Sequence, residues 1–208
     1  MPIKRIKSSH QKLQLSILHR LQLLDPILGD KINTTDFQIH LTQNEEKEIA
    51  KKFDLTLEGN KKPIMISAMG SGKNKTYPIE YLALLIEMAF ETTNAPMILN
   101  YMPNQKMEIN RLFKMLKPKT KKAIQNSLTP NSLRDYIVTV SQCQAVIGNE
   151  GGAINIAKGL SKPTFAIFSP IIDPYGWHTE VKNNTVAVLL VDYFPEIIDF
   201  KNKIKDYL

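Results

Sequence analysis

The fold is decided by the stretch AVIGNEGGAINIAKGLSKPTFAIF, which spans residues 145–168. Two apolar runs, residues 145–148 and 164–168, flank a segment that opens with Gly151 and Gly152. Short, continuous apolar runs are typical of strands that are buried on both faces of a sheet. The glycine pair predicts the start of a helix between them, so the stretch has the pattern of two parallel strands joined by a helix.

The same alternation of strand and helix extends over most of the chain. Further strands are predicted at residues 64–69, 97–101 and 186–191. Helices are predicted from Pro78 onward, over residues 109–116 with Pro118 as the stop, and over residues 132–142. We therefore expect an α/β fold in residues 59–208, a Rossmann-like parallel sheet with helices on both faces.

The first 58 residues have a different pattern. Every charged residue before Asp25 is basic. Four apolar residues recur there at helical spacing: Leu13, Ile17, Leu21 and Leu24. This predicts a basic amphipathic helix that ends near Asp25-Pro26, and a linker helix packed on its own domain is favoured over a membrane-surface helix. With a second short helix at residues 42–52, residues 1–58 form a predicted helical extension.

Composition narrows the class of protein without selecting a function. The 208 residues are 43% hydrophobic and 23% charged, as in ordinary globular domains. A net charge of +7 favours anionic partners, whether nucleic acid, an acidic membrane surface or a phosphorylated ligand. The single cysteine, Cys143, excludes an internal disulfide and a multi-cysteine zinc site. We expect no bound metal and no cofactor, and no apolar run approaches the roughly 18 residues of a membrane span.

The loop after the first predicted strand, residues 70–76, is rich in glycine and lysine. It is not a Walker P-loop, because Ser67 stands where the first glycine is required and Asn74 where the magnesium-binding hydroxyl is required. Its backbone amides, the Ser71 hydroxyl and its lysines can nevertheless hold a diphosphate. The alternative is a solvated turn in which glycine supplies an unusual backbone conformation.

A second loop follows the strand at residues 145–148. Glu150 lies at the strand end, and the amides of Gly151 and Gly152 would face a phosphate at the start of the next helix. Glu150 can accept hydrogen bonds from sugar hydroxyls, and Asn155, one turn on, can donate to the same ligand. The alternative is that Glu150 caps its own helix and the glycines allow close packing.

A third loop, after residue 168, carries Tyr175, Trp177 and His178. These rings could border a base or a sugar, or equally cover the edge of the core.

At these loops the sequence resembles the C-terminal half of glycosyltransferase family 9, the lipopolysaccharide heptosyltransferase family. The strongest stretch is VIGNEGGAINIAKGLSKPT, residues 146–164, and KTYP (residues 75–78) and FSP (residues 168–170) also match. Three positions depart from the family pattern: Glu150 replaces an Asp, Gly151 a Ser or Thr, and Asn155 a His.

The resemblance implies one half of a two-domain GT-B glycosyltransferase that inverts the transferred sugar without a metal. The C-terminal domain of such an enzyme holds a nucleotide sugar, commonly ADP-heptose. Its N-terminal domain holds the lipopolysaccharide acceptor and the general base, so no catalytic residue is assigned here. By position, Lys75 would neutralise the departing diphosphate and Ser71 would bind it, with Gly70 of the same loop as a further donor-binding residue. Gly151 and Gly152 would bind phosphate through their amides, Glu150 the sugar or ribose, and Asn155 phosphate or sugar.

Only about 60 residues precede the first predicted strand, which is too few for an acceptor domain. The expectation is a donor-binding half that needs a separate acceptor domain and turns over poorly alone. It would work in the cytoplasm, its positive charge suited to the inner face of the inner membrane. The departures at Glu150, Gly151 and Asn155 leave open a non-catalytic nucleotide-sugar-binding module. Nucleic-acid binding ranks last, because the lysines are spread along the chain.

Overall fold

The computed structural model describes residues 22–28, 37–57, 59, 61–169, 172 and 186–190. Most of the predicted basic helix before Asp25 lies outside these residues, as do Tyr175, Trp177 and His178. Within them, η1 (Gln22–Leu24) is followed by α2 (Asp25–Leu28). The helical segment thus continues past the predicted stop at Asp25-Pro26, because proline is tolerated in the first turn of a helix.

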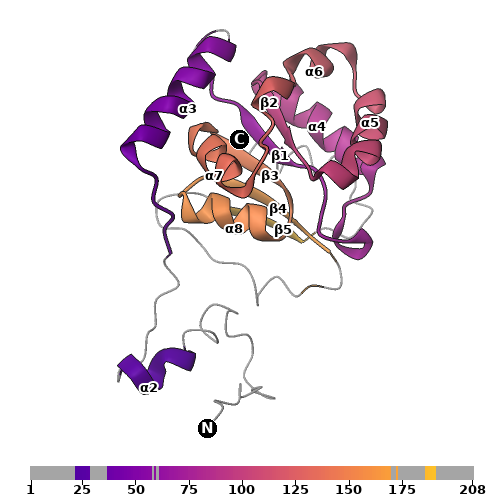
Figure 1. The fold of residues 1–208 in the computed structure, drawn as a ribbon. Helices are drawn as coiled ribbons and strands as arrows, with labels where there is room; N and C mark the ends of the chain where they lie inside the picture. Colours follow the sequence, from indigo (N-terminus) through magenta and orange to yellow (C-terminus); the bar gives the residue numbers. More distant parts are fainter. Residues whose placement is uncertain are drawn as a thin grey trace.

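A parallel sheet forms the centre of the described part of the chain (Figure 1). Its strands are β1 (Ile64–Ser67), β2 (Met97–Asn100), β3 (Ala145–Asn149), β4 (Thr164–Phe168) and β5 (Val186–Leu190). They lie in the order β2-β1-β3-β4-β5, and every pairing is parallel. The predicted α/β fold with a parallel sheet is therefore confirmed.

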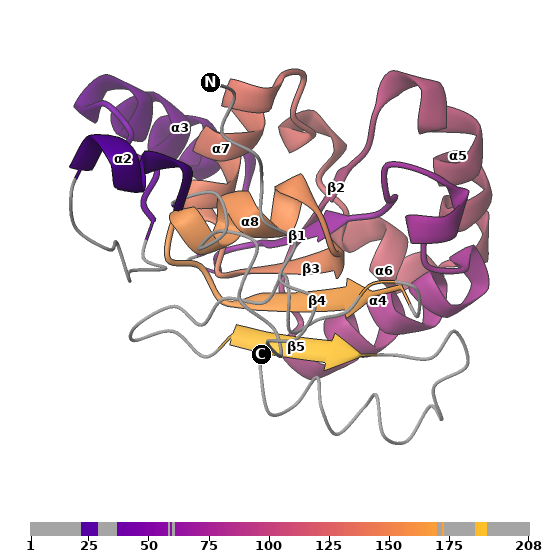
Figure 2. The same cartoon turned by 90° about the horizontal axis from the view of Figure 1, so that it is seen from below.

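Helices cover both faces of this sheet (Figure 2). One face carries α4 (Ile79–Thr93), α5 (Lys106–Met115) and α6 (Pro118–Ala123), and the other carries α3 (Gln43–Thr56), α7 (Leu133–Gln142) and α8 (Gly152–Gly159). Alternate residues of β1 divide between the two layers: Ile64 and Ile66 pack under α4, and Met65 packs under α7 and α8. Burial of apolar side chains on both sides is what makes a parallel sheet stable.

Among the described residues, the connections between the strands include the 3-10 segments η2 (Lys73–Lys75), η3 (Pro103–Gln105) and η4 (Asn126–Leu128). Helix α5 ends at Met115, before Pro118, as predicted, but the separate helix that Pro118 begins was not predicted. Pro118 lies in the first turn of α6, where the missing N–H of proline costs nothing. No helix in the described ranges has both the length and the apolar character needed to cross a bilayer.

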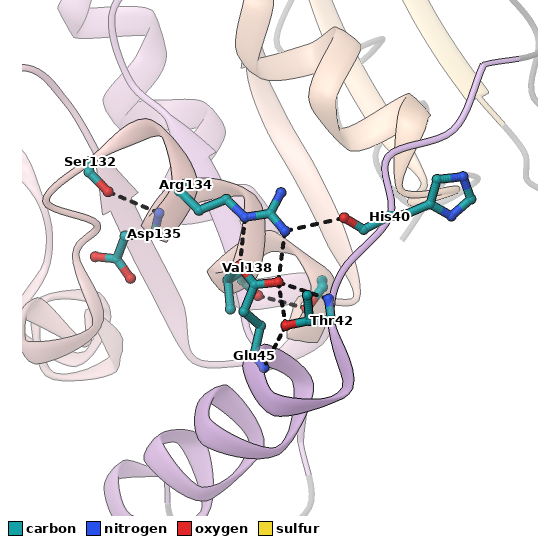
Figure 3. A network of polar contacts seen from close by, with 8 residues as sticks. His40, Thr42, Glu45, Ser132, Arg134, Asp135 and Val138 are labelled. Atoms are coloured by element: carbon teal, nitrogen blue, oxygen red, sulfur yellow. Dashed lines mark hydrogen bonds and ion pairs between the residues drawn. The ribbon is translucent and has the colours of Figure 1, made fainter.

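Helix α3 is fastened to α7 by a bridge of polar contacts (Figure 3). The Arg134 guanidinium donates to both carboxylate oxygens of Glu45, at 2.6 and 2.7 Å, and to the carbonyl oxygen of His40 at 3.2 Å. Glu45 also accepts from the backbone N–H and the hydroxyl of Thr42, which completes a capping box. Below the bridge, Ile49 and Phe53 enter the core, so α3 packs as part of this layer.

The bridge predicts an acid-sensitive contribution to stability. The Arg134 hydrogen bond, followed by those from Thr42, lowers the pKa of Glu45 from 4.5 to about 2. A carboxyl group with a lowered pKa stabilises the fold above its unfolded pKa and loses that effect as the pH falls through its folded pKa. Glu45→Gln should therefore be less stable than the wild type near neutral pH.

The stability difference should shrink as the pH falls from about 4.5 toward about 2. Urea unfolding of both proteins at a series of pH values measures it. Glu46→Gln, in the same turn, keeps the bridge and is the matched control. If the difference in the free energy of unfolding between Glu45→Gln and the wild type is the same at every pH, the prediction is wrong.

Candidate functional site

The candidate site lies where two neighbouring strands send the chain to opposite faces of the sheet. From β1 the chain passes to α4 on one face, and from the adjacent β3 it passes to α8 on the other. The loops at the carboxyl ends of β1 and β3 therefore diverge. In open parallel sheets, ligands bind at such a divergence, and both predicted phosphate loops lie there.

Asn149, the last residue of β3, joins the two loops. Its side-chain oxygen accepts a hydrogen bond from the backbone N–H of Tyr77 at 2.6 Å, and its side-chain nitrogen donates to the carbonyl oxygen of Ala68 at 3.2 Å. Asn149 is buried, with 5% of its surface exposed. Both ends of the glycine-rich loop are thus held by one amide, although the sequence analysis assigned Asn149 no role.

Within the glycine-rich loop, one hydroxyl fixes the backbone. The Thr76 hydroxyl accepts from the Gly70 N–H at 3.1 Å and donates to the Gly72 carbonyl at 2.9 Å. Gln105 donates to the Gly70 carbonyl at 3.3 Å. The Gly70 amide is therefore engaged inside the loop in this structure. Ser71 and Lys75 are exposed, so the hydroxyl and the lysine are accessible to a ligand.

The ends of β1 and β3 approach each other closely. A Cβ atom on Gly148 would lie 2.5 Å from both the Cβ and the carbonyl oxygen of Ser67, so this position requires glycine. Beside it, the Tyr136 hydroxyl lies 3.3 Å from the Ser67 hydroxyl and donates to the Ala153 carbonyl, also at 3.3 Å. Tyr136 thereby connects the end of β1 to the first turn of α8.

The N-terminus of α8 has the form of an anion site. Gly151 is the N-cap, and no side chain in the described part of the chain caps the helix. Its φ of 151° lies in a region that side chains disfavour, which explains glycine at this position. Gly152 is exposed, and the N–H of the half-buried Asn155 makes the first intrahelical bond, to the Gly151 carbonyl at 3.1 Å. The earlier amides have no partner within the helix.

Glu150 lies beside this helix start without capping it. Its backbone N–H donates to the Ile167 carbonyl at 2.8 Å, which holds the residue over the end of β4. Its side chain is half-buried, and burial raises the pKa of the carboxyl group, while the charges of Lys75 and Lys158 act in the opposite direction. Burial also lowers the pKa of Lys158 to about 8, although the negative charge of Glu150 acts to raise it.

A small hollow lies between these loops, with a volume of about 10 Å³. Lys75, Asn149 and Ser169 are among the residues that line it. This is room for about one water molecule, so a nucleotide would lie over the loops. The Ser169 hydroxyl donates to the Asn74 carbonyl at 2.8 Å and ties the end of β4 to the same loop. Among the residues described, no three His, Cys, Asp or Glu side chains are grouped as metal ligands.

All seven predicted ligand residues lie in two segments that follow the carboxyl ends of the adjacent strands β1 and β3. Gly70, Ser71 and Lys75 come from the loop after β1, and Glu150, Gly151, Gly152 and Asn155 from the segment after β3. Their roles in binding stay predictions.

Two buried polar side chains, Asn149 at the end of β3 and Lys158 in the last turn of α8, have no role in the prediction from sequence. Helical spacing was a signal for Lys158, because it lies four residues after Ile154 on the apolar side of α8.

Three solved structures with the same fold are glycosyltransferases. The ADP-heptose lipopolysaccharide heptosyltransferase II of E. coli is 18% identical, with a TM-score of 0.62 over 82% of this chain and 51% of that one. A glycosyltransferase family 9 protein of Veillonella parvula is 14% identical, with a TM-score of 0.66 over 100% of this chain and 57% of that one. E. coli heptosyltransferase WaaC, solved with ADP-2-deoxy-2-fluoro heptose, is 19% identical, with a TM-score of 0.60 over 95% of this chain and 56% of that one.

The chain thus spans between 51% and 57% of the length of these three structures. No curated protein matches the sequence significantly. The comparison with known families matches residues 1–196 to glycosyltransferase family 9 (heptosyltransferase). Because this match covers nearly the whole chain, the protein belongs to glycosyltransferase family 9, the heptosyltransferase family.

Proposed function

We propose that this chain is the donor-binding half of an inverting glycosyltransferase. Its donor is a nucleotide sugar, ADP-heptose, and the acceptor is a lipopolysaccharide-type glycan held by a separate acceptor domain. The observation that carries the proposal is the start of α8, which no described side chain caps and which follows Glu150 at the divergence of β1 and β3. The positive charge of Lys75, from the other loop, favours the ionised form of Glu150. The ADP-heptose analogue bound by a structural neighbour supports this choice of donor.

The chemistry follows from where charge develops in the reaction. When the glycosidic bond to the diphosphate breaks, the leaving nucleotide gains negative charge. Preorganised amides at a helix start and a nearby lysine stabilise that charge more strongly than water does. In the proposed complex, Lys75 and the amides of Gly151 and Gly152 bind the diphosphate, with Ser71 and Asn155 as further contacts. Glu150 accepts hydrogen bonds from the hydroxyl groups of the sugar or the ribose.

Calorimetric titration of the chain with ADP, ADP-heptose, UDP, GDP and a short oligonucleotide tests the donor site. We expect ADP and ADP-heptose to bind. Lys75→Ala should weaken that binding by about 10- to 150-fold, because a hydrogen bond to a charged group contributes about 1.5–3 kcal/mol.

The matched control is Lys119→Ala, which removes one exposed lysine from α6. Helix α6 is followed by Ile124, which pairs with the first residue of β2, at the opposite edge of the sheet. If both lysine variants weaken binding equally, net charge rather than a site is responsible. If only the oligonucleotide binds, the donor-site proposal is wrong.

A second experiment separates a transferase half from a non-catalytic module. An acceptor domain from a family member is added to the chain together with ADP-heptose and a lipopolysaccharide acceptor. Release of ADP that depends on Lys75 supports the transferase. Donor binding without any release of ADP supports the module instead.

A further inference from the structure

Lys75, the lysine proposed to bind the diphosphate, belongs to a segment that hydrogen bonds hold on both sides. Before it, the Asn74 carbonyl accepts from the Ser169 hydroxyl at 2.8 Å. After it, the Tyr77 N–H donates to the Asn149 side chain at 2.6 Å. Asn149 ends β3 and Ser169 follows β4, so the segment that carries the lysine is anchored to two strand ends outside its own loop.

Between these anchors, Thr76 closes the glycine-rich loop on itself. Its hydroxyl accepts from the Gly70 N–H at 3.1 Å and donates to the Gly72 carbonyl at 2.9 Å. The same Gly72 carbonyl accepts from the Lys75 N–H at 3.0 Å. Thr76 is half-buried, whereas Gly72 and Lys75 are exposed. One half-buried hydroxyl thus holds the beginning of the loop against the residues that carry the lysine.

The closed loop leaves no space between Gly70 and Lys75. A Cβ atom on Gly70 would overlap the Lys75 carbonyl group and would lie 3.1 Å from the Cβ atom of Lys75. The backbone of Gly70 therefore lies directly against Lys75. A shift of Gly70 away from Thr76 would move the point from which the lysine side chain leaves the backbone.

This point of departure matters because the charge of a lysine is mobile. Its ammonium group ends a flexible four-carbon stem, so the backbone decides which region the charge can reach. Lys75 and Thr76 both line the small hollow at this edge, together with Asn149. A backbone that is already in place reduces the entropy lost when a ligand fixes the side chain. If the loop opened, the lysine would bind a diphosphate more weakly although its charge was still present.

We propose that Thr76 is a positioning residue that closes the glycine-rich loop and thereby holds Lys75 where it binds the diphosphate of the donor. The inference rests on the proposed donor site and adds a residue to it. In this role Thr76 acts through Lys75 and not as a ligand of its own.

The test compares ADP binding by the wild type, Thr76→Val and Thr76→Ser. Valine keeps the β-branched shape of threonine without the hydroxyl, whereas serine keeps the hydroxyl. Thr76→Val should bind ADP about five- to tenfold more weakly, and Thr76→Ser should stay within about twofold of the wild type. The rise in Tm with ADP concentration measures the affinity, because it also reports weak binding. The Tm without ADP shows that each variant is folded.

The Lys75→Ala background separates positioning from a general effect on the loop. It has no ammonium group to position, so adding Thr76→Val should change its ADP affinity by less than about twofold. If Thr76→Val weakens binding by the same factor with and without Lys75, the threonine acts on another part of the site and the inference is wrong. It is also wrong if Thr76→Ser binds as weakly as Thr76→Val, because the hydroxyl is then not responsible.

Thr93→Val is the matched control. The half-buried Thr93 also accepts from a backbone N–H, that of Ala95 at 3.2 Å, and donates to a backbone carbonyl, that of Ala89 at 2.7 Å. It ends α4 just before β2 begins, which places it at the opposite edge of the parallel sheet. Its ADP affinity should equal that of the wild type. An equal loss in Thr93→Val and Thr76→Val would overturn the inference.

The two proposals fail differently. If the wild type does not bind ADP, the donor site and this inference are both wrong. If the wild type binds and Lys75→Ala weakens the binding while Thr76→Val does not, only the role of Thr76 is wrong.

Discussion

Asn149→Asp should destabilise the fold by about 2–4 kcal/mol near neutral pH and abolish nucleotide binding. The aspartate keeps an oxygen for the Tyr77 N–H, but it places a second oxygen against the Ala68 carbonyl, where the amide nitrogen now donates. A buried donor or acceptor without a partner costs about 1–3 kcal/mol, and a buried carboxylate costs more. The glycine-rich loop would lose its attachment to β3.

Acid should partly rescue this variant. A protonated aspartic acid can donate to Ala68 as the amide does, so the folded state raises the pKa of the new carboxyl group above its unfolded value. For a carboxyl group with a raised pKa, stability falls as the pH increases through that range. The deficit measured by urea unfolding should therefore be smaller at about pH 5 than at about pH 7.

Asn110→Asp is the matched control, because Asn110 is exposed on α5. Its stability should change by no more than about 0.5 kcal/mol. An Asn149→Asp protein as stable as this control would show that the amide does not hold the two loops together.

Gly148→Ala is the second change with a large expected effect. The added methyl group would overlap Ser67, and both residues belong to paired strands in the centre of the sheet. Forcing extra atoms into a packed interior costs about 1–3 kcal/mol or more. The ends of β1 and β3 would move apart, and the two ligand loops would move with them. Thermal unfolding and ADP titration measure the two effects.

Gly72→Ala is the control for this variant, because a Cβ there meets no atom within 4 Å. Its stability should stay within about 0.5 kcal/mol of the wild type. Equal loss of stability in both glycine variants would mean that the close approach of β1 and β3 is not responsible.

The strands were predictable because their physical signal is local. Each strand of a parallel sheet is buried on both faces, so Ile64–Ser67 and Thr164–Phe168 are short apolar runs with turn residues around them. The order of the strands has no such signal. It depends on which side of β1 each later strand is placed by the helix that connects it. That choice is decided by packing between residues far apart in the sequence.

The failures at single residues have separate causes. Proline both ends helices and begins them, so Pro118 marked the stop after α5 correctly but did not reveal that it also begins α6. Asn149 resembles an ordinary turn residue at a strand end, and its two partners come from a loop more than 70 positions away. Lysine is almost always exposed, so the burial of Lys158 emerges only when α8 is packed on the sheet.

The bridge between α3 and α7 has a consequence for how this protein folds during its synthesis. Glu45 and Arg134 are 89 positions apart in the sequence. At about 5–20 residues per second, the ribosome makes α3 several seconds before α7 exists to receive it. Over that interval Ile49 and Phe53 have no α7 surface to pack on. Contacts of such long range slow folding, so the nascent chain passes through a stage in which α3 offers an uncovered apolar stripe to chaperones.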